Sequence, residues 1–148
     1  MIEVSRTVAT TAERVFAVLA DGWSYAGWVV GASHIRQVED GWPAVNTCIH
    51  HNVGPWPLQV KDVTRVRAID PGRMLELEAR VWPFGAARVR LTLNPVGQDA
   101  TEVCMAEALS SGTGQLIPEV VQGLILRPRN IESLRRLGDI AVHREAER

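Results

Sequence analysis

Cysteine is scarce in this chain of 148 residues. The two cysteines, Cys48 and Cys104, lie far apart in strand-like stretches, and nothing beside them resembles a metal-ligand spacing or a signal peptide. A paired CxxC is also lacking, so neither a disulfide framework nor a zinc site is indicated. We expect two reduced thiols in a cytoplasmic protein.

Long apolar runs and an excess of one charge are absent too. The longest apolar stretches fall well short of the roughly 20 residues that cross a bilayer, so we expect a soluble protein without stable membrane insertion. Sixteen basic residues against seventeen acidic ones leave a net charge of -1, which argues against a broad nucleic-acid surface. Neither nucleic acid nor a membrane is therefore an expected partner.

Cofactor motifs are missing as well. The sequence has no glycine-rich phosphate loop after a strand and no His-x-x-x-His spacing on a helix. His50 and His51 are neighbours on a predicted strand, so they point to opposite faces and do not easily chelate one metal. No Ser-His-acid arrangement suggests itself. We expect no metal and no cofactor.

The sequence does contain a regular series of turns. Turn-forming residues recur at intervals typical of a meander, in Asp40-Gly41, Gly54-Pro55, Asp70-Pro71-Gly72, Pro83-Phe84-Gly85, Pro95-Val96-Gly97 and Ser111-Gly112. Seven strand-like runs result: Ile2–Val8, Ser33–Glu39, Thr47–Val53, Leu58–Ile69, Met74–Trp82, Ala87–Leu93 and Thr101–Ala108. Helix signals lie at the two ends and not between strands. We therefore expect one α+β domain, residues 1–148, with an antiparallel sheet.

Two short helices are predicted after the first strand and a long one at the C-terminus. Thr10 and Glu13 form a capping box at the start of the first helix, and residues 22–29 form the second. Helical spacing resumes at Pro118, and Pro128 is expected to kink or split the last helix. Beyond that proline one face is apolar, made by Ile131, Leu134, Leu137, Gly138 and Ala141.

Alternation along the strands indicates which side chains face the core. Apolar residues occupy one parity, for example Leu75, Leu77 and Ala79, while charged residues occupy the other. The charges run Arg65 and Arg67, Glu76 and Glu78, Arg88 and Arg90 across three neighbouring strands. Such an order places opposite charges side by side on a solvated face, where exposed ion pairs mostly fix register and solubility.

Three titratable side chains share the inner parity with the apolar ones and with Thr64 and Thr101. They are His51, Asp62 and Glu107. A buried polar or charged group needs a partner or a purpose, because leaving it unpaired is costly. For the two carboxylates the alternative is a place at the rim of the sheet, where water reaches them. For His51 the alternative is a structural histidine with satisfied hydrogen bonds.

Six segments, spread over nearly the whole chain, carry a family resemblance by their order and spacing. They are the helix start Ala9–Phe16, Trp28–Ala32, Gly54–Pro57, Asp70–Leu75, Ala100–Val103 and Arg129–Leu134. With them the sequence resembles the START-like (SRPBCC) superfamily, and within it the bacterial polyketide cyclase/dehydrase group. The resemblance implies a helix-grip fold, in which a seven-stranded antiparallel sheet wraps around a long C-terminal helix.

The resemblance also implies an internal cavity between sheet and helix, which relatives use for lipids, polyketides, sterols or other apolar ligands. We accordingly expect a small hydrophobic molecule as the partner, in a monomer or a homodimer. Residues expected to contact this molecule are Trp28, Trp56, Val60, Leu77, Val103, Met105 and Leu134. Because the apolar inner face is extensive, a carrier or binding protein is favoured.

An enzyme is the alternative, since the family includes aromatase/cyclases. A cofactor-independent cyclase or dehydratase would fold a flexible chain and move a proton with a histidine or a carboxylate. His51 is then the candidate base, Glu107 the candidate acid and Asp62 a third candidate. A docking module that uses the arginines of residues 127–136 is least favoured, because these arginines are typical of the solvated side of an amphipathic helix.

Overall fold

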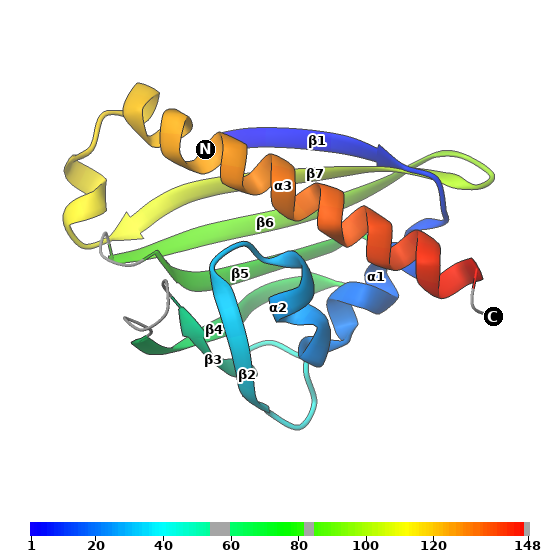
Figure 1. Ribbon diagram of the computed structural model, residues 1–148, viewed down its shortest axis with the longest axis horizontal. Helices are drawn as coiled ribbons and strands as arrows, with labels where there is room; N and C mark the ends of the chain where they lie inside the picture. Colours follow the sequence, from blue (N-terminus) through cyan, green and yellow to red (C-terminus); the bar gives the residue numbers. More distant parts are fainter. Residues whose placement is uncertain (54–59, 82–84, 147–148) are drawn as a thin grey trace.

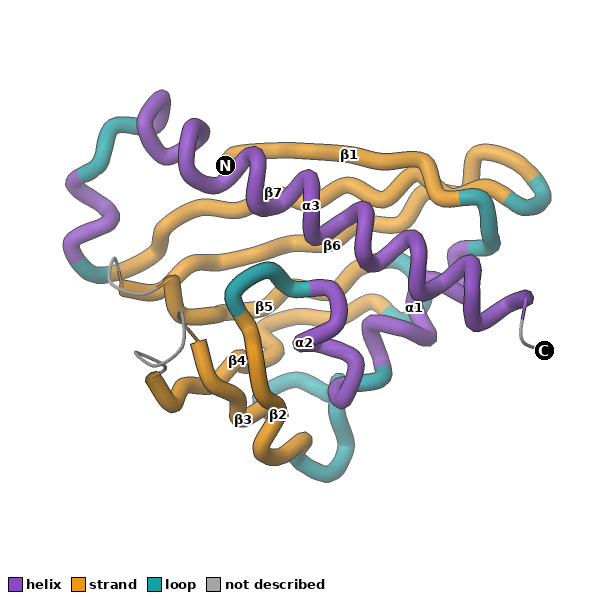
Figure 2. Tube along the Cα trace, viewed as in Figure 1, coloured by secondary structure: helices purple, strands orange, loops and turns teal. Residues whose placement is uncertain are grey.

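The computed structural model describes residues 1–53, 60–81 and 85–146. In this part of the chain one antiparallel sheet has seven strands in the order β1-β7-β6-β5-β4-β3-β2. Their bounds are β1 Ile2–Val8, β2 Ala32–Val38, β3 Cys48–Val53, β4 Val60–Asp70, β5 Met74–Val81, β6 Gly85–Gly97 and β7 Ala100–Ser111. The long helix α3 (Glu119–Ala146) lies across one face of the sheet (Figures 1 and 2). The expected α+β helix-grip architecture is confirmed.

The short helices follow β1, as predicted, with different details. α1 spans Ala12–Ala20, and its cap is Thr11, whose Oγ1 accepts from the Arg14 amide at 3.2 Å. The expected cap, Thr10, is wrong by one residue, and its carbonyl accepts from the Thr101 hydroxyl of β7 at 2.9 Å. The predicted second helix consists of a 3₁₀ turn, η1 (Gly22–Ser24), followed by α2 (Tyr25–Trp28).

Helix α3 continues through Pro128, so of the two expected effects of this proline the split is wrong and the kink stays a prediction. Its sheet-facing residues beyond the proline are buried, and they include Asn130, Ser133, Leu134, Leu137 and Ala141. Ile131, expected on the same face, is 52% exposed. The helix approaches β1 closely at Gly138, where an added Cβ would lie 3.2 Å from Val8 Cγ2. A short 3₁₀ turn, η2 (Thr113–Leu116), precedes α3.

Strand parity follows the predicted alternation on the inner face. In β7 the residues Thr101, Val103, Met105 and Glu107 are all buried, and Leu75 and Leu77 of β5 are buried as well. A register shift between Val66 and Ala68 interrupts the pairing of β4 with β5. The predicted turn at Pro95 is part of β6, which continues to Gly97.

Opposite charges meet on the outer face as the sequence predicts. Glu78 lies opposite Arg65 on one side and Arg88 on the other, while Glu76 lies opposite Arg90. Arg90 Nη2 is 2.9 Å from Glu76 Oε1, and Arg67 pairs with Glu78. The two arginines reach solvent, with side chains 40–50% exposed, whereas the Glu76 side chain beneath Arg90 is only 11% exposed. Exposed ion pairs contribute little to stability, so these pairs mainly fix the register of the strands.

The packing of α3 predicts a contrast between two leucines on this helix. Leu137 has no exposed surface, whereas Leu124 is 73% exposed. Leu137→Ala is expected to lower the free energy of unfolding by about 2–5 kcal/mol, because it leaves a cavity in the core. The matched change Leu124→Ala is expected to cost less than about 0.5 kcal/mol. Urea denaturation of both variants measures the difference, and equal costs would contradict the orientation of α3.

Candidate functional site

Two groups of polar side chains lie inside the molecule, between the sheet and the helices. One joins α2 to β3 and β4, and the other joins β7 to α3. Both contain side chains that are almost fully buried among the apolar residues of the core. Apolar residues would pack such an interior at lower cost, so these polar groups are the candidate site.

The first group is a chain of hydrogen bonds from His51 through Thr64 to Tyr25. His51, on β3, is 2% exposed, and its Nε2 lies 2.8 Å from Thr64 Oγ1 on β4. Thr64 donates in turn to the Tyr25 hydroxyl at 2.9 Å. A threonine hydroxyl has one hydrogen, so this assignment makes His51 the donor to Thr64 through Nε2–H. The hydrogen of the Tyr25 hydroxyl then remains available.

Burial sets the protonation of both ring residues. Desolvation lowers the pKa of His51, because the charged imidazolium loses its hydration. Desolvation also raises the pKa of Tyr25 to about 12, although the Thr64 hydrogen bond opposes this shift. At neutral pH the interior therefore holds a neutral imidazole and a neutral phenol.

The second group is built around Glu107 of β7, which is 1% exposed. Asn130 of α3 donates from Nδ2 to Glu107 Oε1 at 2.8 Å. Arg129 brings Nη1 within 3.4 Å of Oε2 and 3.5 Å of Oε1, which is longer than a strong charge-assisted hydrogen bond. The carboxylate is thus compensated by one short hydrogen bond and one loose ion pair, both from α3.

The same part of α3 holds the connection between α2 and β2. Arg129 Nε donates to the Val30 carbonyl at 3.0 Å, and Ser133 Oγ accepts from the Val30 amide at 3.1 Å. Both backbone polar atoms of Val30 are therefore fixed by the helix. The charges of Arg129 and Glu107 also act on the pKa of Tyr25, so the two polar groups share one electrostatic environment.

The candidate site residues fall in different places. His51 and Glu107 lie in the interior, in separate groups. Asp62 lies opposite His51 in the β3–β4 pairing, is half-buried, accepts from the Val63 amide at 2.8 Å and lines a groove beside Arg65 and Arg67. The other candidates that lie within the described side chains belong to the buried core: Trp28, Leu77, Val103, Met105 and Leu134. Trp56 and the side chain of Val60 lie outside the described part of the chain.

Sequence reasoning missed the partners of these residues. Thr64 had the inner parity and Tyr25 lay in an aromatic segment, but nothing in the sequence joined either to His51. Asn130 could have been found from helical spacing, because it lies four residues after Leu126 and four before Leu134, both buried.

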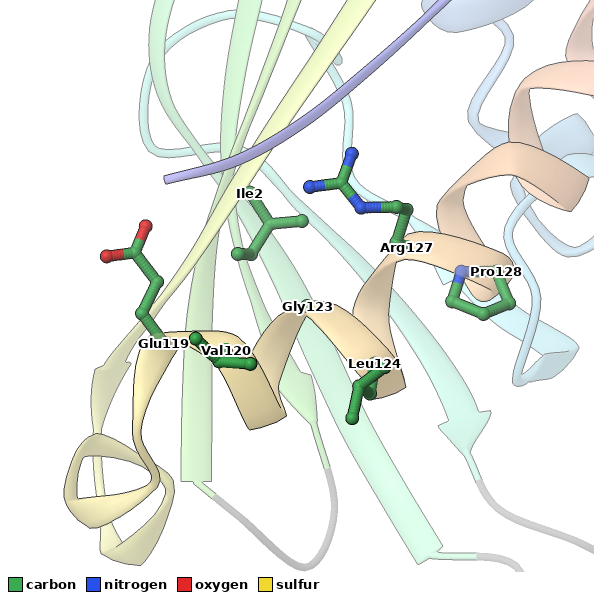
Figure 3. Close-up of a pocket in the computed structure, with 7 residues that line it drawn as sticks. All are labelled: Ile2, Glu119, Val120, Gly123, Leu124, Arg127 and Pro128. Carbon is green, nitrogen blue, oxygen red and sulfur yellow. The ribbon is translucent and has the colours of Figure 1, made fainter.

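A separate groove, here called the outer groove, lies at the surface where the first half of α3 passes β1, and its lining includes no residue of the two polar groups. Figure 3 shows its lining residues: Ile2, Glu119, Val120, Gly123, Leu124, Arg127 and Pro128. Its volume is about 510 Å³. Val120 and Leu124 are mostly exposed there, whereas Ile2 is buried.

Metal-binding clusters and membrane-spanning helices do not occur in the described part of the chain. No group of three or more His, Cys, Asp and Glu side chains among these residues is arranged to hold a metal ion. Among the described helices, none combines the length and the apolar character that crossing a bilayer requires.

Comparison with known proteins identifies the family. A sequence model described as "Polyketide cyclase / dehydrase and lipid transport" matches residues 1–137. The chain belongs to this family. The polyketide cyclase/dehydrase and lipid transport family is the group that the sequence resembles, so the resemblance is confirmed. No curated protein matches the chain.

Several solved structures share the fold of this chain. The Zhui aromatase/cyclase from Streptomyces sp. R1128 has a TM-score of 0.70 at 18% identity, over 97% of this chain and 93% of that one. A conserved protein from Geobacillus kaustophilus has a TM-score of 0.73 at 13% identity, with 95% and 94% covered. Ara h 8.0201 has a TM-score of 0.67 at 11% identity, with 95% and 96% covered. At such identities the likeness shows the fold alone.

The buried phenol gives a prediction that a spectrum can test, because the chain has one tyrosine. Its tyrosinate absorbance is expected to rise with a midpoint near pH 12 in the folded protein and near 10 after unfolding. Stability is correspondingly expected to fall as pH rises from about 10 towards 12, since only the unfolded state releases the proton there. Absorbance near pH 10 in a protein still folded by circular dichroism would contradict the burial of Tyr25.

Proposed function

We propose that this chain binds a small, largely apolar molecule between the inner face of the sheet and α3, as a binding protein or carrier. The observation that supports the proposal most is the pair of polar groups around His51 and Glu107. Ligand sites typically combine an apolar wall with a few placed polar groups that orient the ligand. Here Leu77, Met105 and Leu134 are candidates for the wall.

Entry of a ligand requires the interior to open. The inner-face side chains are nearly fully buried, so a ligand reaches them only if an element moves. The backbone of Val30 is a suitable place, because two hydrogen bonds to Arg129 and Ser133 hold this connection to α3. Breaking them would separate α2 and β2 from the helix without unpairing the central strands.

A second candidate is a cyclase, and the chain from His51 to Tyr25 favours it. In an aldol cyclisation a base removes a proton from a carbon beside a carbonyl, and this carbon then attacks a second carbonyl to form a carbon–carbon bond. A neutral His51 is suited to accept the proton, and the Tyr25 hydroxyl is suited to donate a hydrogen bond to the attacked carbonyl. The protonated His51 would return this proton to the new oxygen, while Glu107, the acid candidate from the sequence, is a carboxylate paired with Arg129 and holds no proton to donate.

Native mass spectrometry of the protein from its own host tests the binding proposal. We expect the protein to carry an additional mass, which organic solvent releases. Identification of the released molecule as a lipid would favour a carrier, and identification as a polyketide-like or ring-closed product would favour a cyclase. The variant Leu124→Glu is the control, because it changes only the outer groove of Figure 3. Retention of the extra mass in this variant would support the interior; loss in the variant alone would place the ligand in the groove.

The cyclase candidate makes a separate prediction for a reactive polyketone substrate. His51→Gln is expected to lower turnover by at least about 100-fold while changing the substrate affinity little, because a general base contributes at least this factor. Because burial lowers the pKa of His51, wild-type activity should persist at pH values below the ordinary histidine range. Unchanged turnover in His51→Gln and in Glu107→Gln would eliminate the cyclase and leave the carrier.

A further inference from the structure

Asn130 is a fully buried amide on the sheet-facing side of α3. It lies between Leu126 and Leu134 on this face of the helix, and all three side chains have at most 1% exposure. An amide in the middle of an apolar helix face requires hydrogen bonds for both its oxygen and its nitrogen. The structure provides a partner for only one of them.

The carboxylate of Glu107 fixes which way the amide points. Carboxylate oxygens accept hydrogen bonds, so the amide turns its Nδ2 towards Glu107 Oε1, at 2.8 Å. The amide oxygen Oδ1 then points elsewhere, is buried, and has no partner among the described residues. A buried amide oxygen without a partner is a strong hydrogen-bond acceptor that lacks a donor.

The neighbours of Asn130 indicate the kind of donor. The guanidinium of Arg129 lies 3.4 Å from the Glu107 carboxylate and balances its charge. The missing donor to Asn130 therefore need not be a cation. Bulk water does not reach a side chain with no exposed surface, so the donor is either an enclosed water molecule or a group of the ligand that displaces it. A neutral hydroxyl group on an otherwise apolar molecule meets both conditions.

We infer that Asn130 Oδ1 accepts a hydrogen bond from a hydroxyl group of the ligand, and that it makes the protein select hydroxylated apolar molecules. This inference rests on the proposed function, because it assumes that the ligand occupies the interior. It adds the chemical class of the ligand and the residue that recognises it. An ether or hydrocarbon of the same shape would leave Oδ1 without a donor and would bind more weakly.

The experiment compares matched probes that differ in the donor alone. The dissociation constants of 2-naphthol and 2-methoxynaphthalene are measured by calorimetry, together with the alkyl pair 1-decanol and 1-methoxydecane. Wild type is expected to prefer the hydroxyl member of a pair by about tenfold, the value of one hydrogen bond between neutral groups. In Asn130→Leu the preference is expected to disappear, with the ether affinity retained.

Ser133→Ala is the matched control on the same face of α3. It removes a buried hydroxyl that accepts from the Val30 amide, so it can change the rate of ligand entry. It is expected to keep the tenfold preference for the hydroxyl probes. If this control loses the preference together with Asn130→Leu, a general loosening of α3 explains the result and the inference is overturned.

A measurement on the wild type covers the case in which Asn130→Leu does not fold. At saturating probe, the side-chain amide signal of Asn130 in ¹⁵N-edited NMR is expected to move further with 2-naphthol than with 2-methoxynaphthalene, because only the naphthol donates a hydrogen bond to Oδ1. Equal affinities for the two members of both pairs would overturn the role of Asn130 and leave the proposed function intact. Failure of all four probes to bind the interior would overturn both.

Discussion

A carboxylate at 1% exposure must be partnered, and the arrangement of this molecule depends on how Glu107 meets that requirement. Its partners, Asn130 and Arg129, come from α3, so the helix is held against β7 by a polar contact as well as by apolar packing. Arg129 then extends the link to the carbonyl of Val30. One buried charge therefore connects the sheet, the long helix and the α2–β2 connection.

This connection gives a physical reason for coupling between binding and opening. A ligand that offers a hydrogen bond near Glu107 would compete with Arg129 for the carboxylate, and Arg129 is also one of two groups that hold Val30. The first half of α3 has fewer buried residues than the second, with Leu126 as its fully buried leucine. The outer groove lies beside this less buried half of the helix (Figure 3).

The sequence predicted the architecture well because each part of it has a local signal. Turn formers separated seven strands, and the alternation of apolar and polar residues was enough to place Glu107 and His51 on the inner face. The partners were harder to find, because a side chain on a helix faces a strand only after the helix has been rotated and placed. Ile131 shows the difficulty: its apolar character suggested the core, yet the face that packs contains Asn130 and Ser133 instead. Thr10 and Thr11 show it on a smaller scale, since both are residue types that cap helices and the structure has the cap at Thr11.

The proposed ligand site is the interior between sheet and α3, and not the outer groove. A crystal structure of the protein with the molecule that copurifies with it tests this placement most directly. We expect ligand density between the inner face and α3, in contact with Met105 and Leu134 and with a polar atom at Asn130 or Tyr25. Density confined to the groove beside Val120 and Leu124, with the interior unchanged, would contradict it.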